Sequence, residues 1–414
     1  MDLLRFITAG SVDDGKSTLI GRLLYDSKSI LSDQLEAIER SSKNLDESGV
    51  DLALLTDGLR AEREQGITID VAYRYFTTPK RKFIIADAPG HVQYTRNMIT
   101  GASNADAIII LIDARQGVLE QTRRHTIIAS LLKLKHVIVA INKMDLVGYS
   151  EERFMTIKEQ FNSIAFALQL GEIHFLPISA KLGDNVVNTS NKMPWYNGDS
   201  VLELLEKLEI QNDKVLDFGR FQVQFVIRPQ TAELHDYRGY AGRISSGIYK
   251  KGDAVGILPI NRLSVITKIE IDGKEVGEAF EGQSVIVHLQ DDIDISRGDM
   301  IVSINEQPLL GNEFEAVMCW MDEKQLQEGN RYILQHGSRQ VRAIVKKLQY
   351  RLDVNSLEKK PVEDAVRLNE LVKVTLKTSA PIAIDFFEVH KETGSAILID
   401  ETANSTVAAI MFTR

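Results

Sequence analysis

Short, continuous apolar runs alternate with longer amphipathic stretches over the first half of the chain. Such runs, rich in Ile and Val and bounded by polar turns, are typical of strands that are buried on both faces. The stretches 120–134 and 150–168 instead carry apolar residues at helical spacing. The predicted buried strands are Phe6–Ala9, Phe83–Ala86, Ala107–Ile112, Val137–Ile141 and Phe175–Ile178. Because strands and helices alternate, this region is predicted to be an α/β domain with a mostly parallel sheet.

From about Asp213 onward the pattern changes to short strand-like segments separated by Gly and Asp turns. This pattern of short strands and turns is typical of β-barrels, and a second set of such segments begins near Asn312. The two sets are Phe221–Ile227, Gly242–Ile244, Ala254–Leu258, Leu263–Ile271 and Ser284–Leu289, then Phe314–Met321, Arg331–Gln335, Gln340–Leu348, Leu371–Leu376 and Ala396–Asp400. The chain is therefore predicted to form a nucleotide-binding-type α/β domain over 1–211 and two β-barrels over 212–309 and 310–414.

Composition narrows the class of protein further. A chain of 414 residues is long enough for roughly three folded units. Its 49 Lys and Arg against 58 Asp and Glu leave a net charge of −9, which disfavours a nucleic-acid partner. No apolar run approaches the length of a membrane span, the N-terminus lacks a signal-peptide pattern, and Cys319 is the sole cysteine. We therefore expect a cytoplasmic protein with no membrane partner and no disulfide.

A glycine-rich loop follows the first predicted strand and opens a helix. Its residues are Gly10, Ser11, Val12, Asp13, Asp14, Gly15, Lys16 and Ser17, with Thr18 as the next helical residue. This is the spacing of a loop whose backbone N–H groups and helix N-terminus bind phosphates. Lys16 is expected to neutralise the β- and γ-phosphates, and the Ser17 hydroxyl to bind Mg²⁺.

Three further motifs follow predicted strands in the order that a nucleotide-binding α/β domain requires. They are Asp87-Ala88-Pro89-Gly90-His91, Asn142-Lys143-Met144-Asp145 and Ser179-Ala180-Lys181. Asp87 is expected to hold the Mg²⁺ water shell, and His91, beside the γ-phosphate, to position the attacking water. A carboxylate at Asp145 can accept both N–H donors of guanine, whereas adenine offers no such pair, so GTP is favoured over ATP. Asn142 is expected to link this loop to the phosphate loop, with Lys143 and Ser179–Lys181 flanking the base.

These motifs resemble those of the translation-factor superfamily of GTPases, and the resemblance extends along essentially the whole chain. The segment Ala61–Asp70 resembles the first switch of that superfamily, which implies that Thr68 binds Mg²⁺ and senses the γ-phosphate. The resemblance also implies the water-positioning role of His91. In the second domain, Arg238–Tyr240, Gly242–Ile244, Gly247 and Gly252-Asp253 match the first β-barrel of the superfamily.

A closer resemblance is to the family of large, GTP-binding subunits of bacterial sulfate adenylyltransferase (ATP sulfurylase). It rests on Gly10–Asp14, Asp70–Phe76, Gln93–Met98 and Gln121–His125. The family implies a GTPase whose hydrolysis of GTP drives formation of adenylyl sulfate and pyrophosphate from ATP and sulfate. Its implied partner is a small catalytic subunit of ATP-pyrophosphatase type. Because the sequence to Arg414 has no second phosphate loop, we expect no fused adenylyl-sulfate kinase activity.

Two other functions fit the same nucleotide motifs. An elongation-factor-like GTPase that delivers aminoacyl-tRNA would keep every GTP residue and differ only in what the barrels hold. A nucleotide-dependent scaffold without enzymatic activity is the second alternative. The polar segment Asp26–Glu62 is predicted to be a helical insert, which is either an arm that contacts a partner or a solvated helix pair.

Overall fold

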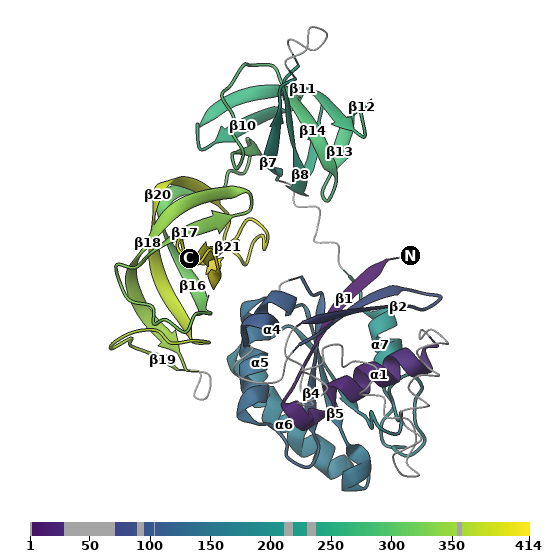
Figure 1. Cartoon of the computed structure of the whole chain (residues 1–414). Coiled ribbons are helices and arrows are strands. Elements are labelled where there is room, and N and C mark those ends of the chain that lie inside the picture. Colours follow the sequence, from purple (N-terminus) through teal and green to yellow (C-terminus); the bar gives the residue numbers. More distant parts are fainter. Residues whose placement is uncertain are drawn as a thin grey trace. The chain divides into compact units, whose positions relative to one another are not determined.

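The structure is a computed structural model that describes residues 2–28, 71–88, 95–102, 104–210, 218–229, 237–353 and 358–414. Three principal β-sheets follow one another along the chain (Figure 1). The described residues fall into two compact units, one ending at Ile210 and one that contains both barrels. The predicted boundary at 211 lies outside the described residues, so the domain limits stay a prediction. None of the described helices is both long and apolar enough to span a bilayer.

The first sheet has the order β2-β3-β1-β4-β5-β6. All neighbouring strands in it are parallel except the pair β2 and β3. Its strands are β1 (Leu3–Ala9), β2 (Ala72–Thr77), β3 (Lys82–Asp87), β4 (Ala107–Asp113), β5 (His136–Asn142) and β6 (Glu172–Pro177). Every residue of β4 is buried, which explains why this strand is a continuous apolar run.

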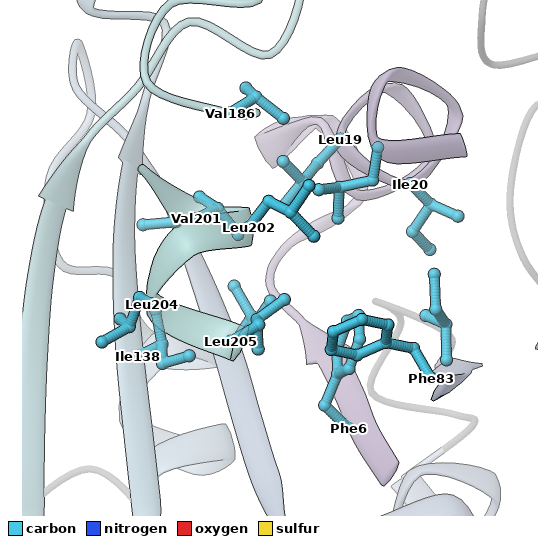
Figure 2. Packing of buried hydrophobic residues seen from close by; sticks show 14 of the residues in the cluster. Phe6, Leu19, Ile20, Phe83, Ile138, Val186, Val201, Leu202, Leu204 and Leu205 are labelled. Atoms are coloured by element: carbon cyan, nitrogen blue, oxygen red, sulfur yellow. The ribbon is translucent and has the colours of Figure 1, made fainter. Parts of the chain in front are cut away.

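Helices complete the first unit. They are α1 (Lys16–Asp26), α4 (Thr95–Ala102), α5 (Glu120–Leu131), α6 (Glu151–Ala167) and α7 (Val201–Lys207). The start of α6 is set by Ser150, whose hydroxyl accepts a hydrogen bond from the backbone N–H of Arg153 at 3.2 Å. Side chains of α1 and α7, such as Leu19 and Leu205, pack with Phe6 and Phe83 of the sheet in one buried cluster (Figure 2). This cluster holds α1, and with it the loop that precedes α1, against the sheet.

The other two principal sheets are closed barrels, as predicted. The first runs β10-β15-β7-β8-β14-β11-β12 and closes by pairing β10 with β11, and the second runs β17-β21-β22-β16-β20-β18-β19 and closes by pairing β17 with β18. The strands are β7 (Arg220–Ile227), β8 (Gly239–Ser246), β9 (Ile248–Lys250), β10 (Ala254–Leu258), β11 (Arg262–Ile271), β12 (Lys274–Val276), β13 (Glu278–Phe280), β14 (Ser284–Leu289), β15 (Met300–Ser303), β16 (Leu309–Trp320), β17 (Arg331–His336), β18 (Arg339–Leu352), β19 (Lys359–Lys360), β20 (Leu371–Ile384), β21 (Ser395–Ile399) and β22 (Thr406–Phe412). Of these strands, β9 and β13 form a separate two-stranded sheet. The α/β domain followed by two β-barrels is therefore confirmed.

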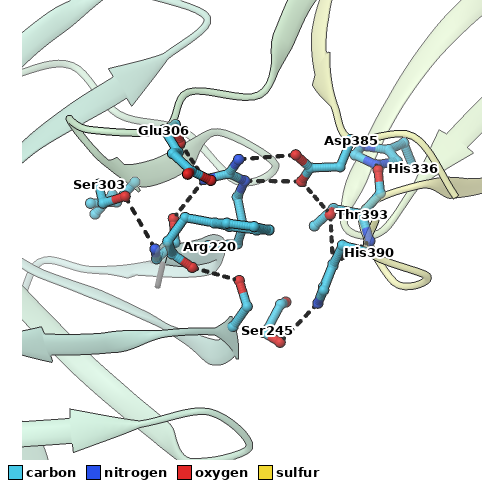
Figure 3. Close-up of polar contacts among 12 residues, drawn as sticks. Arg220, Ser245, Ser303, Glu306, His336, Asp385, His390 and Thr393 are labelled. Atoms are coloured by element: carbon cyan, nitrogen blue, oxygen red, sulfur yellow. Dashed lines mark hydrogen bonds and ion pairs between the residues drawn. The ribbon is translucent and has the colours of Figure 1, made fainter. Parts of the chain in front are cut away.

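A buried ion pair joins the two barrels. Arg220 on β7 donates two hydrogen bonds of 2.9 Å to the carboxylate of Asp385, which follows β20 (Figure 3). The side chains are only 2% and 7% exposed. Thr393 donates to the same carboxylate at 2.6 Å, and Arg220 also donates to the Glu306 carbonyl at 2.8 Å. Burial alone would raise the pKa of Asp385, but the hydrogen bonds and charge of Arg220 lower it. The pair therefore stays ionised and fully hydrogen-bonded.

Replacing Arg220 by methionine should lower the free energy of unfolding of the barrel unit by about 3 kcal/mol, because it leaves the Asp385 carboxylate buried without its cation. Urea unfolding of the full chain measures this change. The matched control is Arg342→Met, because Arg342 pairs with Glu401 but is 78% exposed. That control should cost less than about 1 kcal/mol. Equal losses in the two variants would contradict the role assigned to the Arg220 pair.

Candidate nucleotide-binding site

Four parallel strands, β1, β3, β5 and β6, deliver the predicted site residues to one edge of the first sheet. Register pairs Thr8 of β1 with Asp87 of β3, and Asp113 of β4 with Asn142 of β5. The carboxyl ends of parallel strands share an edge, which is where open α/β sheets bind their ligands. The glycine-rich loop leaves β1 at this edge, and Ser179–Lys181 follows β6 there. The structure therefore brings together the described parts of all four motifs.

The glycine-rich loop wraps around the side chain of Lys16. The Lys16 ammonium donates to the carbonyl oxygens of Gly10 at 3.0 Å and Ser11 at 2.8 Å. Within the loop, the Asp14 carboxylate accepts from the Ser11 N–H at 2.5 Å, and Val12–Asp14 form one 3-10 turn. Burial lowers the pKa of Lys16, while the charges of Asp87 and Asp14 oppose that shift. The loop thus places a buried cation at the N-terminus of α1, where phosphate oxygens bind.

Asn142 links three loops through one side chain. Its amide nitrogen donates to the Asp14 carbonyl at 2.8 Å, and its amide oxygen accepts from the Ala180 N–H at 2.9 Å. The contact expected between Asn142 and the phosphate loop is therefore present. Gly15 makes it possible, because a Cβ atom at Gly15 would lie 2.5 Å from the Asn142 amide nitrogen, and its φ of +93° also favours glycine.

The loop after β5 presents the residues predicted to contact the base. Lys143 has a left-handed backbone with φ of 62°, and its ammonium donates to the Asp13 carbonyl. Met144 is buried, whereas Asp145 is half-buried and has no hydrogen-bond partner among the described residues. Opposite this loop, Ser179 and Ala180 are buried and Lys181 is exposed. The Asp145 carboxylate, to which no described residue donates, is available for the paired N–H donors of guanine.

Asp113 is a site residue that the sequence analysis missed. Its side chain is 1% exposed and lies 3.0 Å from the Lys143 ammonium, while Arg115 donates to the same carboxylate at 2.6 Å. Burial alone would raise the pKa of Asp113, but the hydrogen bonds from Arg115 and Lys143 lower it to about 2. The carboxylate therefore stabilises the folded state fully above about pH 4, and this contribution is lost as the pH falls towards 2.

Replacing Asp113 by asparagine should weaken guanine-nucleotide binding about tenfold, because the neutral amide no longer holds the Lys143 ammonium in place. Calorimetric titration with GDP measures the affinity, and the acid-induced loss of stability between pH 4 and 2 should shrink in the same variant. Arg115→Gln is the matched control, since it removes the other partner of Asp113 and leaves Lys143 paired. If Arg115→Gln weakens binding as much as Asp113→Asn, Asp113 does not act through Lys143.

Oxygen donors suitable for Mg²⁺ lie at the same edge. The buried Asp87 carboxylate accepts from the Thr8 hydroxyl at 3.2 Å, which fixes one of its oxygens. The hydroxyls of Ser17 and Thr18, at the start of α1, make no hydrogen bond within the described residues. A carboxylate and a free hydroxyl are hard ligands that fit Mg²⁺. Thr68, Pro89, Gly90 and His91, together with most of the Asp26–Glu62 insert, lie outside the described residues.

Comparisons with known proteins place these features in a family. Residues 1–214 match the elongation factor Tu GTP binding domain, and residues 313–413 match the GTP-eEF1A C-terminal domain-like family. The chain is 51% identical over 412 residues to sulfate adenylyltransferase subunit 1 of Teredinibacter turnerae, covering 99% of this chain and 87% of that protein. It is 54% identical over 413 residues to the bifunctional enzyme CysN/CysC of Mycobacterium tuberculosis H37Rv, covering all of this chain and 67% of that protein.

Among solved structures, the chain is similar to Sup35 complexed with GMPPNP, with 25% identity and a TM-score of 0.45 over the whole chain and 94% of Sup35. The similarity to subunit 1 proteins extends over 99% of the chain. The chain therefore belongs to the sulfate adenylyltransferase subunit 1 family, within the translation-factor superfamily of GTPases.

Proposed function

We propose that this chain is the GTP-hydrolysing subunit of a sulfate adenylyltransferase and that it works in the cytoplasm. Guanine binding is supported by one observation above all: Asp145 lies without a hydrogen-bond partner among the described residues, in a loop that Asn142 joins to the phosphate loop. The sulfate-activating role is supported by relatives named sulfate adenylyltransferase subunit 1, which are about half identical over 99% of the chain.

The chemistry of sulfate activation divides between two subunits in this proposal. The partner, a small catalytic subunit, joins a sulfate oxygen to the α-phosphorus of ATP and releases pyrophosphate, which yields adenylyl sulfate. Formation of this mixed anhydride is uphill, so a second reaction must drive it. The present chain carries one set of nucleotide motifs and that set fits guanine, so its contribution is the hydrolysis of GTP to GDP and phosphate.

The predicted phosphate, metal and water residues have distinct parts in GTP hydrolysis. Lys16 neutralises the β- and γ-phosphates, and the loop N–H groups hold their oxygens. Ser17, Asp87 and Thr68 would hold Mg²⁺, which neutralises charge on the phosphates when it is bound. His91 orients the attacking water beside the γ-phosphate. Loss of the γ-phosphate, which Thr68 is proposed to sense, couples hydrolysis to the partner.

Reconstitution tests the proposal directly. The chain is mixed with the small subunit, ATP, sulfate and Mg²⁺, with and without GTP, and adenylyl sulfate is measured. We expect product to accumulate only with GTP, and a non-hydrolysable GTP analogue to give no sustained accumulation. The matched control is Lys16→Ala, which should behave as if GTP were absent. Recovery of charged tRNA in a pull-down, with no small subunit bound, would instead support the elongation-factor alternative.

A further inference from the structure

Two histidines and a glutamate meet at the edge of the first sheet opposite the nucleotide site. His136 is the first residue of β5, and Glu172 and His174 lie at the start of β6. The parallel register places His136 beside Glu172 and Ile138 beside His174. Side chains two residues apart project from the same face of a strand, so all three meet on one face. His136 lies six positions before Asn142 on β5, which is about 20 Å along the strand.

The spacing of the donor atoms fits a metal ion. His136 Nδ1 lies 3.5 Å from one Glu172 carboxylate oxygen, and His174 Nε2 lies 3.3 Å from the other. Within the described residues, this is the one group of three such side chains whose donor atoms all lie within 4.8 Å of one another. Nitrogen and oxygen donors bound tetrahedrally to Zn²⁺ at about 2.0–2.1 Å lie about 3.3 Å apart. Small rotations of the three side chains would therefore bring their donor atoms to the spacing of a tetrahedral Zn²⁺ site.

The hydrogen bonds of the two rings leave their nitrogens available. His136 Nε2 lies 3.1 Å from the Glu209 carbonyl oxygen. A carbonyl only accepts, so Nε2 carries the proton, and in the neutral ring Nδ1 presents its lone pair towards Glu172. Metal-binding histidines use this arrangement, in which the second ring nitrogen donates to a carbonyl. His136 Nδ1 and His174 Nε2 are both buried atoms without any hydrogen-bond partner in the described structure. Both nitrogens face the Glu172 carboxylate, and a cation bound between them would satisfy all three groups.

We propose that His136, Glu172 and His174 bind one Zn²⁺ ion. Two imidazoles with a carboxylate suit Zn²⁺ better than Mg²⁺ or Ca²⁺, which prefer oxygen ligands. Glu172 is 62% exposed, which gives the ion a route from solvent. The site ties the starts of β5 and β6 together and, through the Glu209 carbonyl, to the segment after α7. The site lies apart from the nucleotide residues, and zinc binding to it does not depend on nucleotide chemistry.

Zinc titration of the full chain tests this site. The chain is first saturated with Mg²⁺ and GDP, and Zn²⁺ binding is then followed by calorimetry and by X-ray absorption at the zinc edge. We expect one equivalent to bind with two imidazole ligands in its coordination shell. At a free Zn²⁺ concentration about 100 times the Kd, the Tm should rise by about 5 °C or more. The absorption spectrum separates this site from the nucleotide site, whose metal donors are all oxygens, even if GDP does not bind.

Variants identify the ligands. His174→Gln and Glu172→Gln should each weaken Zn²⁺ binding by at least about tenfold and lose the zinc-dependent rise in Tm. Their Tm without zinc shows that the variants fold. The matched control is His288→Gln, because His288 lies 3.7 Å from the Glu270 carboxylate but has no second histidine beside it in the described structure. Zinc binding that survives both ligand variants, a spectrum with oxygen ligands only, or no binding of zinc would overturn the proposal.

Discussion

Replacing Asp145 by asparagine should change the base preference of this protein from guanine to xanthine. Guanine presents N–H donors at N1 and N2, whereas xanthine has a carbonyl oxygen in place of the 2-amino group. The asparagine amide accepts from N1 and donates to that oxygen, but it opposes the amino group of guanine. GTP loses a charge-assisted hydrogen bond worth about 3 kcal/mol, and XTP gains about 3 kcal/mol because it makes a new hydrogen bond and its carbonyl oxygen no longer faces a carboxylate. The ratio of the two affinities should therefore shift by roughly 10⁴-fold.

Calorimetric titration with GDP and XDP measures both affinities in the absence of turnover. Asp145→Ala is the control, because it removes the guanine contacts without offering xanthine a donor, so it should lose GDP binding and should not bind XDP more tightly. The half-buried position of Asp145 makes large folding defects in either variant unexpected. Unchanged GDP affinity in Asp145→Asn would contradict the placement of the base and, with it, the preference for GTP over ATP.

Replacing His91 by alanine should lower the rate of GTP hydrolysis by about 10³-fold, the midrange for loss of a group that positions or activates the attacking water. GTP affinity should stay within about threefold of the original, because His91 is not assigned to the phosphates or the base. Fixed-time assays of phosphate release measure the rate of GTP hydrolysis, and a separate binding titration measures the GTP affinity. Adenylyl sulfate formation with the small subunit should fall together with phosphate release.

The control for His91 is Lys16→Ala. Lys16 is buried in the phosphate loop, so its loss should abolish binding as well as hydrolysis. The two variants thus separate a defect in catalysis from a defect in binding. GTP hydrolysis that continues at its original rate in His91→Ala would show that another group positions the water, and it would leave the GTP-binding assignment intact.

The fold was predictable wherever burial leaves a simple pattern. The five predicted buried strands of the first domain all match observed strands, because β3 to β5 are almost wholly enclosed. The strand β2 was not predicted because its tyrosines, Tyr73 and Tyr75, are exposed and alternate with other side chains on an antiparallel edge. In the second barrel β20 continues to Ile384, eight residues past the predicted end at Leu376. A polar stretch with a proline concealed that continuation.

The site was predictable where motifs carry fixed spacing. The loops around Lys16, Asn142 and Ser179 meet at one edge, as their place after strands predicts. Asp113 belongs to no motif, and its partnership with Lys143 joins two strands that only folding brings side by side. The one signal for it was its position at the end of a wholly buried strand. His136 and Glu172 were missed for the same reason, since 35 intervening residues separate neighbours in the sheet.

The hydrogen bonds made by Asn142 affect how tightly the protein binds an intact nucleotide. Because the Asn142 amide joins the loops of Asp14 and Ala180 in the absence of nucleotide, these two loops are preorganised relative to each other. The base and the phosphates then bind to two sites that are held at a fixed distance from each other, so binding of one part favours binding of the other. Guanosine and inorganic triphosphate supplied as separate molecules should bind far more weakly than the intact nucleotide, since covalent linkage gives the second half a high effective concentration.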